Sequence, residues 1–497
     1  MNNLLSHVRY KSRPDLSPPK LHIGIATDPG SLAPGYIFVT PCALFDAPRD
    51  SGPEQPGAYI FRSDGDLVWS SLGFLGGWTA NFQAVTYRGQ PVLQAFTGQL
   101  AKRHGRGYGT HVLLDGGYKQ VATVQSLDRL VSFHEFRVVG GKTALVQVRV
   151  PRVRDLGGCG GGGGEGKRWV VDDVFQEIDI ETGETVFEGR SLDFADPKES
   201  FVALDSQPNC GESPDTAWDY FHTNSVDKTS DGDYLVSGRF MCAIYKISSR
   251  DGSLVWRLGG QGSSFTLQND LKFAYQHDVR HLGLSDGGQT ETISMMDNHV
   301  RSDEQHPPGE AEGHHSRGLV VQINHKTKTA TALQTFAPPA GLLAGGQGNV
   351  QMLPNGNAFV GWGVRGAFTE FLGNGTPIYH VILGAEEGVQ SYRAFRYEWE
   401  GRPREKPAVV AARDDKGGVT AWVSWNGDTV TKKWSFFGRG SAGDVHFGDA
   451  TRKSFETSLQ VDVSKVKDAG NIKVFAVALD AEDHELGRSG LADVWTK

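Results

Sequence analysis

The stretch Asp64-Gly65-Asp66-Leu67-Val68-Trp69 is a tight turn followed by a short apolar strand that ends in an aromatic residue. The same pattern returns at residues 182–187, 251–256 and 374–379. A second pattern, a glycine turn before an alternating strand, occurs at residues 231–238 and 355–362. Hairpins that recur through a chain are typical of radial β-sheets, in which each blade buries its faces only against its neighbours. The repeats therefore predict a closed β-propeller.

The rest of the chain supports an all-β fold. Segments of four to eight residues, rich in β-branched and aromatic side chains, alternate with turns, as at 35–39 and 144–150. Glycine makes up 64 of the 497 residues, about 13% against a usual ~7%. We expect an N-terminal arm over residues 1–20, a six-bladed β-propeller over 21–402 and, after a proline-rich linker, a small β-sandwich over 408–497.

Composition excludes several classes of function. The formal net charge of −8 gives no reason to expect a nucleic-acid partner. We expect no membrane span, because no stretch of about 18 consecutive apolar residues occurs. The four cysteines form no Cys-x-x-Cys pair, which excludes a zinc ribbon. The glycine-rich run at 157–166 lacks the Gly-Lys-Ser/Thr ending of a phosphate loop, so we interpret it as a flexible surface loop.

Polar and aromatic residues that stand just before predicted strands are the candidates for a site. In a propeller these positions line one end of the central channel, where groups from several blades converge. The candidate residues are His134, Trp218, Tyr220, His222, Asn224, His277, Asn298, Arg317, Gln347, Asn349, Trp362, Tyr392 and Arg393.

Each candidate also has a structural interpretation. His222 and His277 could be core histidines, and Arg317 could pair with Asp297. The three tryptophans Trp218, Trp256 and Trp362 could belong to blade cores, and Gln347 and Asn349 to a glycine-rich turn. His134 beside Glu135 is either a general base with its orienting acid or part of a salt bridge. His306, His314 and His315 lie in a loop-like stretch, so we expect solvated histidines and no metal there.

Together these motifs resemble the arylsulfotransferase-like family, and its fungal branch in particular. The resemblance also includes residues 12–19, 34–38, 133–136 and 423–427 and covers nearly the whole chain. It implies a six-bladed propeller with a C-terminal β-sandwich, in proteins that are usually secreted. Met1 to Leu5 lack the charged start and apolar run of a signal peptide. We expect a protein of the secretory pathway, with a cytoplasmic location as the open alternative.

The family also implies chemistry. Bacterial relatives move sulfate between phenols through a histidine, without a nucleotide donor. Some fungal proteins that look like this chain are associated with secondary metabolism, including hetero-Diels–Alder reactions between a quinone methide and a terpene. By motif match, His222, His277 and Arg317 stand where the family places channel imidazoles and an arginine. The match assigns the bacterial nucleophile to no residue of this chain.

The first hypothesis is therefore a cofactor-free enzyme that catalyses a hetero-Diels–Alder-type cycloaddition on phenolic or quinonoid small molecules, with a terpene as a possible second substrate. His222, His277 and Arg317 would polarise an oxygen, and an apolar slot would orient the reactants. The predicted slot consists of Trp218, Tyr220, Trp362 and Tyr392. The second hypothesis is aryl sulfotransfer through a histidine nucleophile. The third is a non-catalytic binding propeller, which a channel plugged by side chains would favour.

Overall fold

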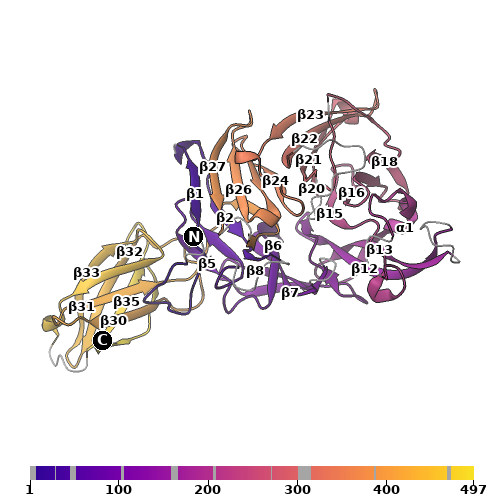
Figure 1. Cartoon of the computed structure of the whole chain (residues 1–497). Helices are drawn as coiled ribbons and strands as arrows, with labels where there is room; N and C mark the ends of the chain where they lie inside the picture. The colour runs from indigo at the N-terminus through magenta and orange to yellow at the C-terminus, as the bar shows by residue number, and fades with distance from the viewer. Residues whose placement is uncertain are drawn as a thin grey trace.

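The computed structural model describes residues 7–27, 29–44, 52–101, 106–157, 166–204, 209–269, 271–299, 315–384, 388–466 and 472–496. As the repeats predict, the chain forms a six-bladed β-propeller followed by a C-terminal sheet that curls into a nearly closed sandwich (Figure 1). Within the described ranges, no helix is both long and apolar enough to cross a membrane.

The blades are numbered here around the ring, and their strands are given from the channel outward. Blade 1 holds β29 (Ala394–Tyr397), β2 (Tyr36–Val39), β4 (Tyr59–Phe61) and β5 (Leu67–Ser70). Blade 2 holds β6 (Trp78–Tyr87), β7 (Gln90–Ala101) and β8 (Arg106–Leu114), with β9 (Gln120–Val124) and β10 (Val131–Ser132) both paired to β8. Blade 3 holds β11 (Phe136–Val139), β12 (Thr143–Asp155), β13 (Lys167–Asp179) and β14 (Thr185–Arg190).

The other three blades follow the same order. Blade 4 holds β15 (Thr223–Lys228), β16 (Tyr234–Gly238), β17 (Ala243–Ile247) and β18 (Leu254–Gly259). Blade 5 holds β20 (His277–Ser285), β21 (Thr290–Asp297), β22 (Arg317–Asn324), β23 (Thr329–Phe336) and β19 (Thr266–Leu267). Blade 6 holds β24 (Asn349–Met352), β25 (Ala358–Gly361), β26 (Ala367–Phe371), β27 (Pro377–Ile382) and β1 (His22–Ala26).

Both ends of the propeller chain close the ring. β29 comes last in the sequence yet is the inner strand of blade 1, where Tyr397 pairs with Tyr36. β1 comes first and is the outer strand of blade 6, where His22 pairs with Ile382. Because each end completes the sheet of the other, the ring cannot open without breaking two strand ladders.

The repeated pattern builds the outermost hairpin of four blades. It joins β4 to β5, β13 to β14, β17 to β18 and β26 to β27. The glycines Gly65, Gly183, Gly252 and Gly375 all have positive φ, between 75° and 86°. In each case the register shifts beside the turn. A left-handed glycine next to a bulge lets a short loop follow the twist of its strands, which is why the pattern recurs.

Hydrophobic cores lie between neighbouring blades. Phe38 and Ile60 of blade 1 pack with Leu93 and Val112 of blade 2. Equivalent clusters join blades 2 and 3, 3 and 4, 4 and 5, 5 and 6, and 6 and 1. Burial of apolar area contributes about 25 cal/mol per Å², and this contribution is available to each blade only inside the ring.

The C-terminal sheet has the strand order β33-β32-β35-β37-β30-β31-β34, with β36 paired to β35. Its strands are β30 (Ala408–Arg413), β31 (Val419–Ser424), β32 (Lys433–Gly440), β33 (Gly443–Thr451), β34 (Glu456–Val461), β35 (Lys473–Leu479), β36 (Glu485–Arg488) and β37 (Ala492–Thr496). β37 pairs with both β30 and β35 and so joins the two layers. The layers share one core that includes Val423 and Phe436.

Asn426 and Gly427 dock this sandwich on blade 1. The backbone N–H of Ser70 donates to Oδ1 of Asn426, and Nδ2 of Asn426 donates back to the Ser70 carbonyl, both at 2.9 Å. The Tyr118 hydroxyl donates to the Gly427 carbonyl at 2.6 Å. Gly427 has φ +93°, and a Cβ there would lie 2.3 Å from the Tyr118 ring, so glycine is required. The Trp-Asn-Gly motif of the last domain thus fixes its position beside β5 (Figure 1).

Candidate functional site

Residues just before or near the start of the inner strands meet around the axis at one end of the channel. Asn81, His222, Asp278 and Gln347 have φ values of 52°, 56°, 53° and 63°. This left-handed region is uncommon for residues other than glycine, and such strain often collects at functional sites. Asn81 and Asp278 also stand at shifts in strand register, and His222 lies next to another. The strain therefore marks this end of the channel as the candidate site.

Three imidazoles gather there, and we refer to His134, His222 and His277 as the histidine cluster. The rings of His134 and His222 lie 5.0 Å apart, centroid to centroid, and are nearly perpendicular. The three residues retain only 3–6% exposure. Burial, aided by nearby guanidinium groups, lowers the pKa of all three, that of His222 to about 4. The cluster is therefore neutral near pH 7.

His222 forms a dyad with Asp219. Nδ1 of His222 lies 2.7 Å from Oδ2 of Asp219, three residues earlier. Residue 218 is held against β13 by paired backbone hydrogen bonds with Trp169 and Val171, and the left-handed turn at His222 then leads into β15. A carboxylate at Nδ1 keeps the proton on that nitrogen. Nε2, which has no partner in the described part of the chain, then carries the lone pair.

His277 uses both of its ring nitrogens within the fold. Nδ1 lies 2.6 Å from Oδ1 of Asn298 and 3.1 Å from the Tyr275 carbonyl, so it carries the proton. Nε2 accepts from the backbone N–H of Gln347 at 3.1 Å. Asn298 in turn donates to the carbonyls of Ala344 and Gln347. His277 and Asn298 thus tie blade 5 to the segment before β24.

His134 lies between the imidazole of His222 and an aromatic wall. Nδ1 of His134 is 2.9 Å from the Ser132 hydroxyl. Its ring stacks on Phe133 at 4.0 Å and meets Tyr392 edge to face at 5.9 Å. Trp78 packs against Phe133 at 4.6 Å. Trp78, Phe133 and Tyr392 thus form a packed aromatic group beside the imidazoles.

Directly next to the cluster, charged side chains fill the axis. We refer to Glu135, Asp278, Arg280 and Arg393 as the axial ion network. Arg393 pairs with Glu135 at 3.2 Å and with Asp278 at 3.1 Å, and Arg280 pairs with the same two acids at 2.9 and 2.6 Å. Arg393 also donates to Asn81 and to the carbonyls of His134 and Asn224. Its guanidinium thus contacts four other blades and closes the channel at this level.

The structure brings some of the predicted residues together and separates others. His134, His222, His277, Asn298, Gln347 and Tyr392 lie at the cluster. Arg393, Asn224 and Asn349 tie inner strands together; Asn349 exchanges two hydrogen bonds of 2.8 Å with Ala394. Arg317 lies at the start of the third strand of blade 5, where its guanidinium binds Asp297 at 3.0 Å and the Lys272 carbonyl at 2.6 Å.

The remaining aromatic candidates lie inside the blades. Trp218 and Tyr220 belong to the core between blades 3 and 4, and Tyr220 bonds Ser191 at 2.9 Å. Trp362 is fully buried between blades 5 and 6 and donates to Thr369 at 2.8 Å. Glu135 accepts from Phe136, Val226 and the two arginines. None of its recorded contacts is to the His134 ring.

Sequence reasoning did not single out Asp219, Arg149, Arg280 or Asn81. Asp219 stands in the segment before β15, and its spacing of three residues from His222 was the available signal. Arg149 lies in mid-strand, among valines, where nothing local distinguishes it from a solvent-facing residue.

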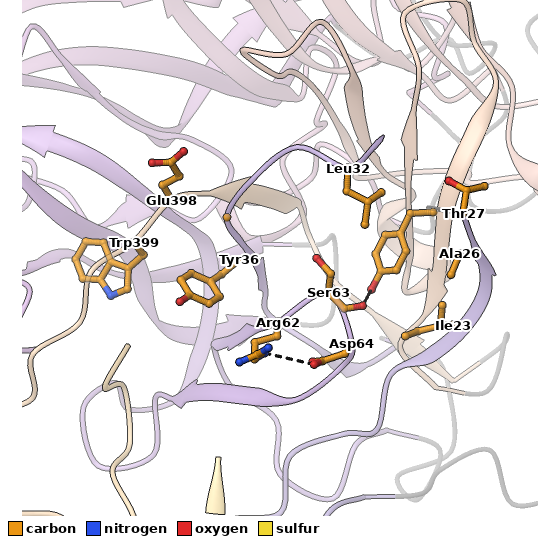
Figure 2. Close-up of a pocket in the computed structure, with 12 residues that line it drawn as sticks. Ile23, Ala26, Thr27, Leu32, Tyr36, Arg62, Ser63, Asp64, Glu398 and Trp399 are labelled. Carbon is orange, nitrogen blue, oxygen red and sulfur yellow. Dashed lines mark hydrogen bonds and ion pairs between the residues drawn. The ribbon is translucent and has the colours of Figure 1, made fainter. Parts of the chain in front are cut away.

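A cluster of acidic and imidazole side chains and a pocket lie away from this end of the channel. In the described residues, the one group with metal-like spacing is Asp480, Glu482 and His484, on an exposed turn of the sandwich. His306 and His314 lie outside the described residues. A pocket of about 820 Å³ lies beyond the opposite end of β29 (Figure 2). Tyr36, Arg62, Asp64 and Trp399 line it, with Arg62 and Asp64 paired at 3.4 Å.

Comparison with known proteins places the chain among relatives. A model of the arylsulfotransferase (ASST) family matches residues 83–384. No match is found among curated proteins. A solved protein of unknown function from Bacteroides caccae is similar, with 11% identity, 73% of this chain and 98% of that chain covered, and a TM-score of 0.38. Hydrazine synthase from Kuenenia stuttgartiensis shows 12% identity, coverage of 73% and 78%, and a TM-score of 0.32. Virginiamycin B lyase from Staphylococcus aureus shows 9% identity, coverage of 69% and 87%, and a TM-score of 0.20.

Proposed function

The chain belongs to the arylsulfotransferase (ASST) family, and from this premise we propose that it transfers a sulfuryl group between phenols, with His222 as the transient nucleophile. The observation that carries the proposal is the 2.7 Å contact between Asp219 and Nδ1 of His222. A histidine nucleophile needs a neutral ring with a lone pair on its outward nitrogen. The dyad supplies the tautomer, and burial supplies the neutral form.

The proposed reaction balances without a cofactor. Nε2 of His222 attacks the sulfur of an aryl sulfate, the bond from sulfur to the aryl oxygen breaks, and the phenolate leaves and takes a proton from solvent. The hydroxyl oxygen of a second phenol then attacks the sulfur, loses its proton to solvent and frees the imidazole. The positive charge on the sulfurylated ring is stabilised by Asp219.

The surroundings of His222 suit an aromatic, anionic substrate. Phe133 and Tyr392 offer apolar faces beside His134. Arg149 and Arg239 are close enough to His222 to lower its pKa and to oppose the negative charge of Asp219. An aryl sulfate combines a flat apolar ring with one negative group, which matches this combination of features.

The cycloaddition hypothesis has less support from this geometry. It requires hydrogen-bond donors that converge on one oxygen. The neutral dyad leaves His222 with an acceptor at Nε2, and Nε2 of His277 already accepts from Gln347. Arg317 is engaged by Asp297 and Lys272. A binding propeller is favoured by one observation, the axial ion network that closes the channel, and we retain it as the second candidate.

The test is an exchange assay with an aryl sulfate donor and a phenol acceptor, without nucleotide, followed by intact-protein mass spectrometry. We expect exchange and a mass gain of one sulfuryl group. His222→Ala should abolish the mass gain and reduce exchange by ~10⁴-fold, whereas His446→Ala, on the sandwich, should change neither. Ring formation from a quinone methide and an alkene, with no protein modification, would favour the cycloaddition. Neither reaction, with a phenol bound, would favour the binding propeller.

A further inference from the structure

Arg149 on β12 lies behind the dyad and shares an oxygen atom with it. Nη1 of Arg149 donates to Oδ2 of Asp219 at 2.9 Å. The same Oδ2 lies 2.7 Å from Nδ1 of His222. The Asp219 carboxylate is therefore held from two sides, by the permanently charged guanidinium and by the imidazole. The guanidinium fixes the direction in which the carboxylate points.

A second carboxylate anchors Arg149 to the start of β15. Asp173 faces Arg149 directly across the β12–β13 ladder, and its Oδ1 lies 3.3 Å from Nε of the arginine. Oδ2 of Asp173 accepts from the backbone N–H of Thr223 at 2.7 Å. Because Thr223 follows His222 in the chain, this network sets the position of both members of the dyad.

The fold alone does not explain an arginine at this place. The Arg149 side chain is 2% exposed, and its Nη2 has no hydrogen-bond partner in the described part of the chain. A buried donor without an acceptor is costly. A costly local choice of this kind commonly marks a functional site.

We propose that Arg149 is a positioning residue, which holds Asp219 ionised and aimed so that His222 keeps its proton on Nδ1 and its lone pair on Nε2. The link to turnover rests on the proposed sulfuryl transfer. The effect on the His222 ring does not, because it follows from contacts within the protein.

The charges that face His222 determine the direction of the effect. Asp219, from the segment before β15, raises the pKa of His222, whereas Arg149 on β12 and Arg239 after β16 lower it. The other two imidazoles, His134 before β11 and His277 on β20, are also within electrostatic range. Loss of the Arg149 charge, with the other groups in place, therefore makes His222 easier to protonate.

The test compares Arg149→Met with Arg149→Lys, which keeps the charge, and with Arg152→Met as a matched control. Arg152 lies on the same strand and pairs with Asp172, away from the dyad. The first readout is the pKa of His222 in the free protein, from NMR of histidine-labelled protein with His222→Gln for assignment. We expect Arg149→Met to raise the pKa of His222 by about one unit or more. Arg149→Lys should keep this pKa close to the wild-type value, and Arg152→Met should leave it unchanged.

The second readout is the pH profile of the exchange reaction. We expect Arg149→Met to move the acid limb upward by the same amount and to lower exchange ~10- to 100-fold. An unchanged His222 pKa in folded Arg149→Met would overturn the proposal. If Arg149→Met does not fold, the ¹⁵N chemical shifts of the His222 ring are compared in Arg149→Lys and Asp219→Asn. We expect the Nδ1–H tautomer to be lost in Asp219→Asn and kept in Arg149→Lys. If the wild type shows no exchange, the proposed function fails while the NMR titration still decides this inference.

Discussion

The histidine cluster and the axial ion network lie next to each other and are built from the same positions of the fold. Both consist of residues that precede or begin inner strands. In the axial network, Glu135 and Asp278 are each shared between Arg280 and Arg393. In the cluster, Nε2 of His134 and of His222 has no partner within the described residues. Buried charges must be paired for the fold to be stable, and the axial network meets this requirement. The two unpaired nitrogens of the histidine cluster are the atoms available for chemistry.

A step of one residue separates the two roles. His134 belongs to the cluster and Glu135 to the network, and the same holds for His277 and Asp278. Tyr392, which meets the His134 ring edge to face, precedes Arg393 of the network in the same way. Blades 1, 3 and 5 thus each place one residue in or beside the histidine cluster and the next residue in the axial ion network. A polar motif at the channel end can therefore hold a residue beside the imidazoles and, next to it in the chain, a residue of the axial ion network.

The network should dominate the stability of the propeller. Arg393→Met removes one of the two arginine partners of each buried acid and the donor to two backbone carbonyls. We expect a loss of about 3–5 kcal/mol in the free energy of unfolding, measured by urea denaturation. Arg402→Met, which removes an exposed pair with Glu400, is the control and should cost less than about 1 kcal/mol. Equal effects of the two variants would contradict the distinction.

The cluster should make the protein sensitive to acid. The pKa of His222 falls from its usual 6.5 to about 4 on folding. Between these values the unfolded state binds more protons, so the free energy of unfolding decreases as the pH falls from 6.5 to 4. At about 1.4 kcal/mol per unit, His222 alone accounts for a loss of about 3 kcal/mol. Urea titrations at pH 7 and pH 4.5 should show a smaller loss in His222→Gln than in the wild type.

The fold could be predicted from the sequence because its signals are local. A few adjacent residues are enough to predict a glycine at positive φ beside a bulge, as at Gly65 or Gly252. The cluster was predicted in part for the same reason, since His222 and His277 stand at strand starts. Arg149 was not, because its role depends on Asp219, 70 residues away in the chain. Arg317 belongs to the same end of blade 5 as His277. The sequence left open whether Arg317 serves the channel or pairs with Asp297, and the structure shows the pair with Asp297.

A fourth buried histidine can sharpen the comparison, because it lacks the partners that the cluster has. His111 is 0% exposed and stacks on Phe136 at 4.2 Å. Neither of its ring nitrogens makes a hydrogen bond of good geometry among the described residues. Burial lowers its pKa to about 3, and the nearby Ser132 backbone opposes this only in part. We expect His111→Phe to stabilise the protein by about 1–2 kcal/mol and to reduce its acid sensitivity. Destabilisation in thermal and urea unfolding would show that His111 has a partner role of its own.

The smallest effect is expected from chelation, and it bears on what the cluster is. Three imidazoles at one channel end are a familiar donor set for zinc or iron. The geometry argues otherwise: Nε2 of His277 accepts from Gln347, and the Nδ1 atoms of His277 and His222 face Asn298 and Asp219. In the described chain, metal-like spacing occurs at Asp480, Glu482 and His484 instead.

We therefore expect EDTA to change the exchange rate less than about two-fold, because the proposed nucleophile acts without a Lewis acid. A loss of activity that one divalent ion restores would overturn this. Such a loss, if it persisted in Asp480→Asn, would place the metal at the cluster and reassign His222 from nucleophile to ligand.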